Sequence, residues 1–115
     1  MVEDDFSLNN AMARILRIAG FAPSVFASAE ELLASREGVD AVCVVLDVQL
    51  PGIDGFELHD RLRSRRGVFP VVFVTAFEEG TTRARVREGP GRVFLPKPFS
   101  GHALIDAVHR VVREA

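Results

Sequence analysis

The sequence lacks several features on which whole classes of protein depend. It contains no Trp and no Tyr, and Cys43 is its only cysteine, which excludes an intrachain disulfide and a zinc site built from several cysteines. No apolar run approaches the ~18 residues that would suggest a membrane span, and no signal peptide is evident. The sequence has 14 Lys and Arg and 16 Asp and Glu, so its net charge is −2. This charge gives no reason to expect binding to nucleic acid or to an anionic membrane. We therefore expect a cytoplasmic protein.

The chain has the apolar content of one domain. Its 115 residues are 48% hydrophobic, which is enough for a core at this length, so residues 1–115 are predicted to form a single domain. Helical periodicity alternates with short apolar runs throughout. The predicted helices cover residues 8–19, 29–37, 55–66, 78–89 and 101–112, and the predicted strands cover 22–28, 41–47, 69–77 and 93–95.

Buried strands that alternate with amphipathic helices indicate a parallel sheet with helices on both faces. The run that ends at Asp47 is almost continuously apolar, as expected for a strand covered on both sides. A domain of this kind normally opens with a strand, yet only Met1 and Val2 precede the first acidic residues. The first strand is therefore expected to be truncated.

Polar residues follow the successive strands at the points where the strands end. Glu3 and Asp4 follow the short first strand, Asp47 ends the strand at 41–47, Thr75 lies in the strand at 69–77, and Lys97 follows the strand at 93–95. In open parallel sheets, ligands bind beyond the carboxyl ends of the strands. These side chains are therefore predicted to converge at one edge.

Such a cluster suits a divalent cation and a phosphoryl group. Neighbouring carboxylates repel one another, and an oxygen site with few protein ligands fits Mg²⁺. Each residue alone has a commoner explanation: a strand-ending Asp is usually a turn or cap residue, acidic residues favour a helix N-terminus, and a Lys-Pro pair is usually a rigid loop. The combination, in this order along the chain, is far more specific.

The segments VEDDFS, LDVQLPGIDGFEL, VVFVTAF and FLPKPF together resemble the receiver domain of bacterial response regulators, the CheY-like family. The resemblance covers essentially the whole chain. It implies an α/β flavodoxin-like (βα)5 fold with a doubly wound, parallel five-stranded sheet in the order 2-1-3-4-5, with strand 1 truncated here.

The resemblance also implies roles for the clustered residues. Asp47 would be the phosphoacceptor, and Thr75 and Lys97 would contact the phosphoryl group. Glu3 and Asp4, together with Asp47, would bind Mg²⁺ or Mn²⁺.

Further positions follow from the same resemblance. The backbone carbonyl of Gln49 would complete the metal shell, and Phe94 would act with Thr75 as the conformational switch. The Lys97–Pro98 peptide bond would be cis, which only ~5% of such bonds in folded proteins are.

The implied function is a phosphorylation-activated switch of a two-component system rather than an enzyme with its own substrate. A sensor histidine kinase or a histidine phosphotransfer protein would supply the phosphoryl group. A face formed by residues 78–89, 93–95 and the last helix would change its affinity for partners and is a possible homodimer interface. Gly80 and Pro90 are expected to make the helix over 78–89 short or mobile.

Three other functions fit parts of this pattern. A receiver-like protein-binding domain that is not controlled by phosphorylation stays open. A phosphatase of the haloacid dehalogenase type would carry Asp-x-Asp, whereas Gln49 stands two residues after Asp47. A flavodoxin-type cofactor domain would need a phosphate-binding loop after the first strand, and none is present.

Overall fold

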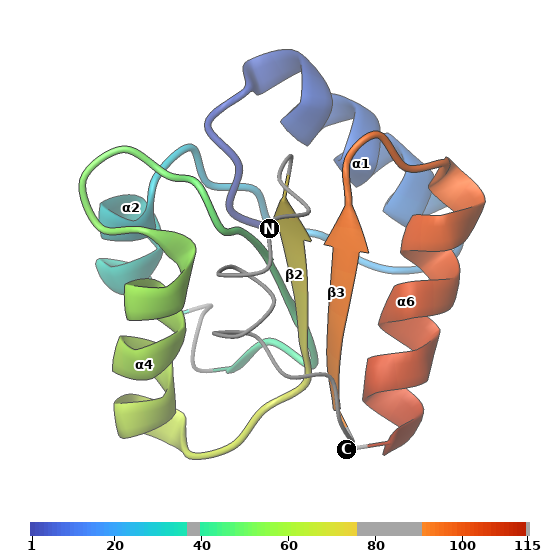
Figure 1. The fold of residues 1–115 in the computed structure, drawn as a ribbon. Helices are drawn as coiled ribbons and strands as arrows, with labels where there is room; N and C mark the ends of the chain where they lie inside the picture. Colours follow the sequence, from blue (N-terminus) through green and yellow to red (C-terminus); the bar gives the residue numbers. More distant parts are fainter. Residues whose placement is uncertain (37–39, 76–90, 115) are drawn as a thin grey trace.

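The computed structural model describes residues 1–36, 40–75 and 91–114 (Figure 1). Helices and strands alternate as the sequence predicts. The helices are α1 (Phe6–Ile18), α2 (Ala29–Leu33), α4 (Gly55–Arg66) and α6 (Gly101–Glu114), and the strands are β1 (Val44–Asp47), β2 (Val71–Thr75) and β3 (Arg92–Pro96). The predicted helix over residues 78–89 lies outside the described residues, and so do Gly80 and Pro90.

The three strands form a parallel sheet in the order β1-β2-β3. The first two expected strands are reduced to isolated bridges, in which Val2 pairs with Phe26 on one side and with Leu46 on the other. Val2 therefore lies between the two segments, where the order 2-1-3-4-5 would put the first strand, but within the described residues only β1, β2 and β3 are regular strands. Pro23 has no N–H to donate, which limits how far a ladder can extend along residues 22–26.

Helices cover both faces of the sheet, as predicted (Figure 1). Alternate strand residues point to opposite faces, so β1 and β2 are apolar on both. On one face Leu46, Val71 and Phe73 form an apolar layer with residues of α2 and α4. On the other face Val45, Val72 and Val74 form a second layer with α1 and α6. The sheet is thus the shared wall of two cores.

Short polar side chains begin the helices. Asp5 accepts a hydrogen bond from the Leu8 N–H at 3.0 Å, and Asp54 accepts one from the Glu57 N–H at 2.9 Å. Ser28 accepts from the Glu31 N–H at 3.2 Å, as Ser at the start of a helix commonly does. The caps fix where α1, α2 and α4 leave the carboxyl end of the sheet, which is where the predicted site lies.

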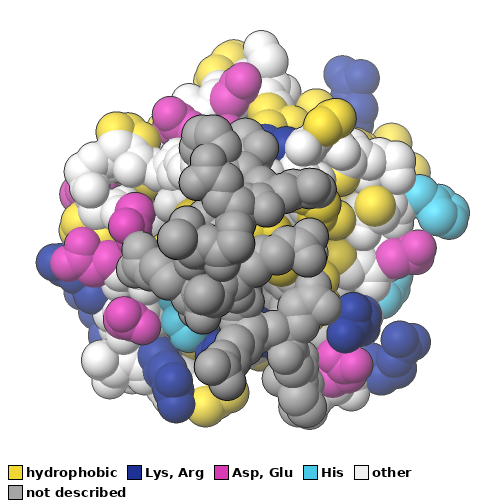
Figure 2. All heavy atoms as spheres, viewed as in Figure 1, with side chains coloured by type: hydrophobic (Ala, Val, Ile, Leu, Met, Phe, Trp, Pro, Cys, Tyr) yellow, Lys and Arg dark blue, Asp and Glu magenta, His cyan; other side chains and the backbone are white. Residues whose placement is uncertain are grey.

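The described surface carries charges of both signs. On the face shown in Figure 2, acidic and basic side chains of the described residues are interspersed with apolar ones. Among the described helices, none is long and apolar enough to cross a membrane.

Candidate functional site

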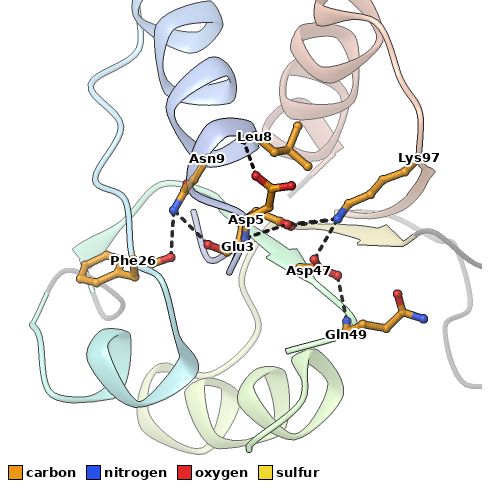
Figure 3. A network of polar contacts seen from close by, with 8 residues as sticks. All are labelled: Glu3, Asp5, Leu8, Asn9, Phe26, Asp47, Gln49 and Lys97. Atoms are coloured by element: carbon orange, nitrogen blue, oxygen red, sulfur yellow. Dashed lines mark hydrogen bonds and ion pairs between the residues drawn. The ribbon is translucent and has the colours of Figure 1, made fainter. Parts of the chain in front are cut away.

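Three charged side chains converge at the carboxyl end of β1 (Figure 3). The Lys97 Nζ lies 2.9 Å from Asp47 Oδ2, and it lies 3.2 Å and 3.1 Å from the two carboxylate oxygens of Glu3. Residues from the start, the middle and the end of the chain therefore meet at one point. The order of polar residues along the strands predicted this convergence.

Asp47 is a buried carboxylate with partners for both oxygens. Its side chain is 3% exposed, and its second oxygen accepts a hydrogen bond from the Gln49 N–H at 2.8 Å. Its own N–H donates to the carbonyl of Val2 at 2.9 Å. A buried charge is tolerated only when it is paired, and the Lys97 ammonium supplies that pairing. This pairing explains how β1, which is buried along its whole length, can end in a carboxylate.

Glu3 is buried as deeply as Asp47. Its side chain is 1% exposed, and the Asp5 N–H donates to it at 3.3 Å. Burial, reinforced by the neighbouring Asp47 carboxylate, raises the Glu3 pKa to about 7, and Lys97 opposes this rise only in part. Burial alone would lower the pKa of Lys97, but its hydrogen bonds and charge interactions with Asp47 and Glu3 outweigh that effect and raise it.

Asn9 holds the backbone on which Glu3 is carried. Its Nδ2 donates to the carbonyls of Glu3 and Phe26, each at 3.1 Å. This role of Asn9 was not predicted from the sequence. The sequence does contain a signal for it. Asn9 stands three residues before Met12 and seven before Leu16, on the buried face of α1, where a polar side chain is expected to have a hydrogen-bond partner.

The donor set at this site fits a hard divalent cation. Glu3, Asp4 and Asp47 each offer a carboxylate oxygen, and these oxygens lie within 4.8 Å of one another. Asp4 is exposed while the other two are buried, so an ion held there would keep contact with water, as Mg²⁺ prefers. Gln49 contacts Asp47 through its N–H. Coordination by its carbonyl remains a prediction.

Asp5 belongs to the helix rather than to this oxygen cluster. Its carboxylate caps α1 at the Leu8 N–H, whereas Glu3 and Asp4 each offer an oxygen to the cluster. This separation provides a matched control for experiments on the acidic cluster.

Thr75 and Phe94 lie on the neighbouring strands. Thr75 ends β2, is fully buried, and accepts the Lys97 N–H at 2.6 Å through its backbone carbonyl. Phe94 is 8% exposed and belongs to the apolar layer that contains Phe73. Phe94 is therefore buried in this structure, and its role as a switch stays a prediction. The Lys97–Pro98 peptide bond is cis.

Gly55 is a site residue that the sequence analysis did not single out. It begins α4, and a Cβ added there would collide with the backbone oxygen of Asp47 and lie 2.8 Å from the Cα of Val48. Only glycine lets the helix approach the end of β1 so closely.

Comparisons with known proteins agree with this geometry. The sequence profile described as "Response regulator receiver domain" matches residues 1–109. Nodulation protein W of Bradyrhizobium diazoefficiens is 34% identical over 108 residues, which cover 94% of this chain and 48% of the relative.

Two solved structures share the fold. A response regulator receiver protein from Burkholderia phymatum is 34% identical, with a TM-score of 0.77 over 99% of this chain and 93% of that one. The chemotaxis protein CheY4 of Vibrio cholerae reaches a TM-score of 0.85 at 24% identity, over 96% of this chain and 93% of that one. The chain spans about half the length of the curated relatives it matches.

Proposed function

The chain belongs to the response regulator receiver domains of two-component systems, and from that membership we propose that it is a switch activated by phosphorylation of Asp47. The observation that carries the proposal is the contact of the Lys97 ammonium with the buried Asp47 carboxylate at 2.9 Å. An ammonium in that position can neutralise charge on an incoming phosphoryl group.

The proposed step is phosphoryl transfer from a phosphohistidine. A carboxylate oxygen of Asp47 attacks phosphorus, the phosphorus–nitrogen bond breaks, and the imidazole leaves with that electron pair. Lys97 stabilises the negative charge on the transferred oxygens. Glu3, Asp4 and Asp47 would hold Mg²⁺ or Mn²⁺, which neutralises further phosphoryl charge when bound. Water later hydrolyses the acyl phosphate and resets the switch.

The proposed readout runs through β2 and β3. Thr75, at the end of β2, would move toward the new phosphoryl oxygens and bind them. Phe94 would then be held in its buried position. Partner affinity would then change on the face that includes β3 and α6. Homodimerisation through this face and a cytoplasmic location belong to the same proposal. The third part of the face, residues 78–89, lies outside the described residues.

The proposed phosphodonor is a protein of the cell, either a sensor histidine kinase or a histidine phosphotransfer protein. The chain itself would take part in the chemistry only as acceptor and in its own dephosphorylation. This division of roles is that of a signalling domain rather than of an enzyme with a separate substrate.

Intact-mass measurement tests the proposal directly. The protein is incubated with Mg²⁺ and acetyl phosphate, and one added phosphoryl group is expected. Asp47→Asn should abolish the adduct, whereas Asp54→Asn, which keeps a capping side chain at α4, should retain it. A folded protein that takes no phosphoryl group would instead support the alternative, a receiver-like binding domain that is not controlled by phosphorylation.

A further inference from the structure

Asn9 is a buried polar residue of α1 whose hydrogen-bonding capacity is only partly used. It is 6% exposed, and its Nδ2 donates to the carbonyls of Glu3 and Phe26, each at 3.1 Å. Both partners are acceptors, so the amide must turn its nitrogen toward them and its oxygen away. Among the described residues, no donor reaches that buried Oδ1. A buried acceptor without a donor is unfavourable, so stability alone does not explain an asparagine at this position.

The two carbonyls lie where the pairing between Val2 and Phe26 ends (Figure 3). The Glu3 N–H donates to the Phe26 carbonyl at 3.1 Å, as in a parallel ladder. In a longer ladder of this register, the Ser28 N–H would donate to the Glu3 carbonyl. Ser28 instead caps α2, and the amide of Asn9 donates to that carbonyl. Asn9 therefore replaces the next hydrogen bond of the ladder.

The residue anchored in this way carries a buried carboxylate of the acidic cluster. The Glu3 side chain is 1% exposed, and its two oxygens lie 3.2 Å and 3.1 Å from the Lys97 ammonium. Glu3, Asp4 and Asp47 offer oxygens within 4.8 Å of one another. Mg²⁺ demands near-ideal octahedral geometry at about 2.1 Å, so a small displacement of the Glu3 backbone would move one ligand out of position.

Asn9 can influence this site without touching an ion. Its two hydrogen bonds go to backbone carbonyls, so it acts on the cluster through the position of the Glu3 backbone. Groups that hold metal ligands in place typically change metal affinity by about 10- to 100-fold when they are removed. The Phe26 carbonyl would keep the Glu3 N–H as a donor if Asn9 were lost, so the Glu3 carbonyl is the group that depends on Asn9.

We propose that Asn9 is a positioning residue of the metal site, which sets the Mg²⁺ affinity of the chain by fixing the backbone of Glu3. The inference rests on the proposed function, because it requires that Glu3, Asp4 and Asp47 bind the ion. It extends the site to α1, which contributes none of the three carboxylates.

The competing explanation is that Asn9 only ties α1 to the sheet. Its substitution would then lower stability, and any loss of ion binding would follow from that. Met12 separates the two explanations, because it lies about one turn further along the buried face of α1, is 2% exposed and belongs to an apolar layer. Asn10 is a second control, as an exposed residue of the same type next to Asn9.

Calorimetric titration with Mg²⁺ tests the proposal on chains that circular dichroism shows to be folded. Asn9→Ala should bind Mg²⁺ about tenfold more weakly than the parent chain. Asn9→Leu, which restores packed volume without a donor, should show a similar loss. Asn10→Ala and Met12→Ala should keep the parent affinity, although Met12→Ala should unfold at a lower urea concentration.

The dependence of phosphorylation on Mg²⁺ gives a second readout. With acetyl phosphate as donor, Asn9→Ala should need about tenfold more Mg²⁺ for half of its maximal rate. The maximal rate itself should equal that of the parent, because Asp47 and Lys97 are unchanged. A maximal rate that stays well below the parent rate would contradict a role limited to metal binding and overturn the inference.

The titrations also distinguish failure of this inference from failure of the metal site. Parent affinity in both Asn9 variants would overturn the role of Asn9, and so would an equal loss of affinity in Met12→Ala. In either case Mg²⁺ binding by the parent chain would leave the proposed metal site intact. A parent chain that binds no Mg²⁺ would refute the metal site and this inference together.

Discussion

At the scale of single residues, opposing effects on the Glu3 carboxyl group set the protonation state of the acidic site. Burial and the Asp47 carboxylate raise the pKa of Glu3 to about 7, while Lys97 works against the rise. Near neutral pH the metal-free protein therefore contains both protonated and ionised Glu3. A cation bound by this carboxylate must displace the proton, and this links metal affinity to pH.

Mg²⁺ binding should therefore weaken as the pH falls below about 7. The expected loss approaches tenfold in affinity per pH unit, because one proton must leave Glu3 for each ion bound. Calorimetric titrations at several pH values measure this dependence. Glu3→Gln should bind weakly and lose the dependence, and Asp5→Asn, which keeps the cap of α1, should behave as the parent chain. A pH-independent affinity in the parent would contradict the prediction.

His59 is a titratable residue in the apolar layer on the side of α4. It is 8% exposed, and its ring centroid lies 5.2 Å from those of Phe69 and Phe73. Burial lowers its pKa, and Arg92 adds to that effect while Asp60 opposes it. Because the folded pKa lies below the unfolded value, the unfolded chain binds more protons as the pH falls through ~6.5.

The stability that neutral His59 contributes should accordingly be present above about pH 6.5 and be lost as the pH falls toward its lowered folded pKa. The raised Glu3 pKa acts in the opposite direction, since its contribution is full below the ordinary carboxyl pKa and is lost as the pH rises through about 7. Comparing the pH dependence of stability in the parent chain with that in His59→Phe separates the two effects, because the variant keeps Glu3 and lacks only the histidine. Urea unfolding of His59→Phe should show less loss of stability on acidification than the parent, and identical pH profiles would count against this account.

At the scale of elements, the contact between α4 and the end of β1 determines how Asp47 is presented. Gly55→Ala would place a Cβ against the backbone of Asp47 and Val48, which cannot move aside as a side chain can. We expect a loss of about 1–3 kcal/mol in the free energy of unfolding and slower phosphorylation by acetyl phosphate.

Gly101→Ala is the matched control for that variant. The atoms nearest to its added Cβ belong to the Ile15 side chain, the first at 3.0 Å, and a side chain can shift where a backbone cannot. Denaturant titrations and intact-mass time courses compare the two chains. Equal effects of both substitutions would show that the contact with β1 has no special importance.

At the scale of the whole molecule, one sheet serves two apolar layers. Leu58 of α4 lies in one layer and Leu104 of α6 in the other, and both side chains are fully buried. Because each strand of the sheet contributes side chains to both layers, a substitution that weakens packing in one layer should also weaken packing in the other layer.

Leu104→Ala should thus lower the free energy of unfolding by about 2–5 kcal/mol and also speed amide hydrogen exchange in α4. Leu58→Ala should have the converse effect on α6. Ile18→Ala, at a side chain that is 80% exposed, should change little. Exchange that increases only on the mutated side would indicate two independent layers.

Much of this organisation follows from the sequence by itself. Local periodicity predicted the described helices and the three strands of the sheet, and the caps at Ser28 and Asp54 are formed within three residues. The meeting of Glu3, Asp47 and Lys97 was also predictable, because parallel strands bring their carboxyl ends to one edge. These features depend on neighbours in the chain or on a general rule of sheet topology.

Other features were decided only by the tertiary structure. The single bridges of Val2, the raised pKa of Glu3, the anchoring by Asn9 and the close approach of Gly55 all require knowing which groups surround a residue. Glu3 and Lys97 are 94 positions apart in the chain, yet they control each other's charge at 3.1 Å. Burial and contact between such distant residues arise from packing in three dimensions, which no local pattern specifies.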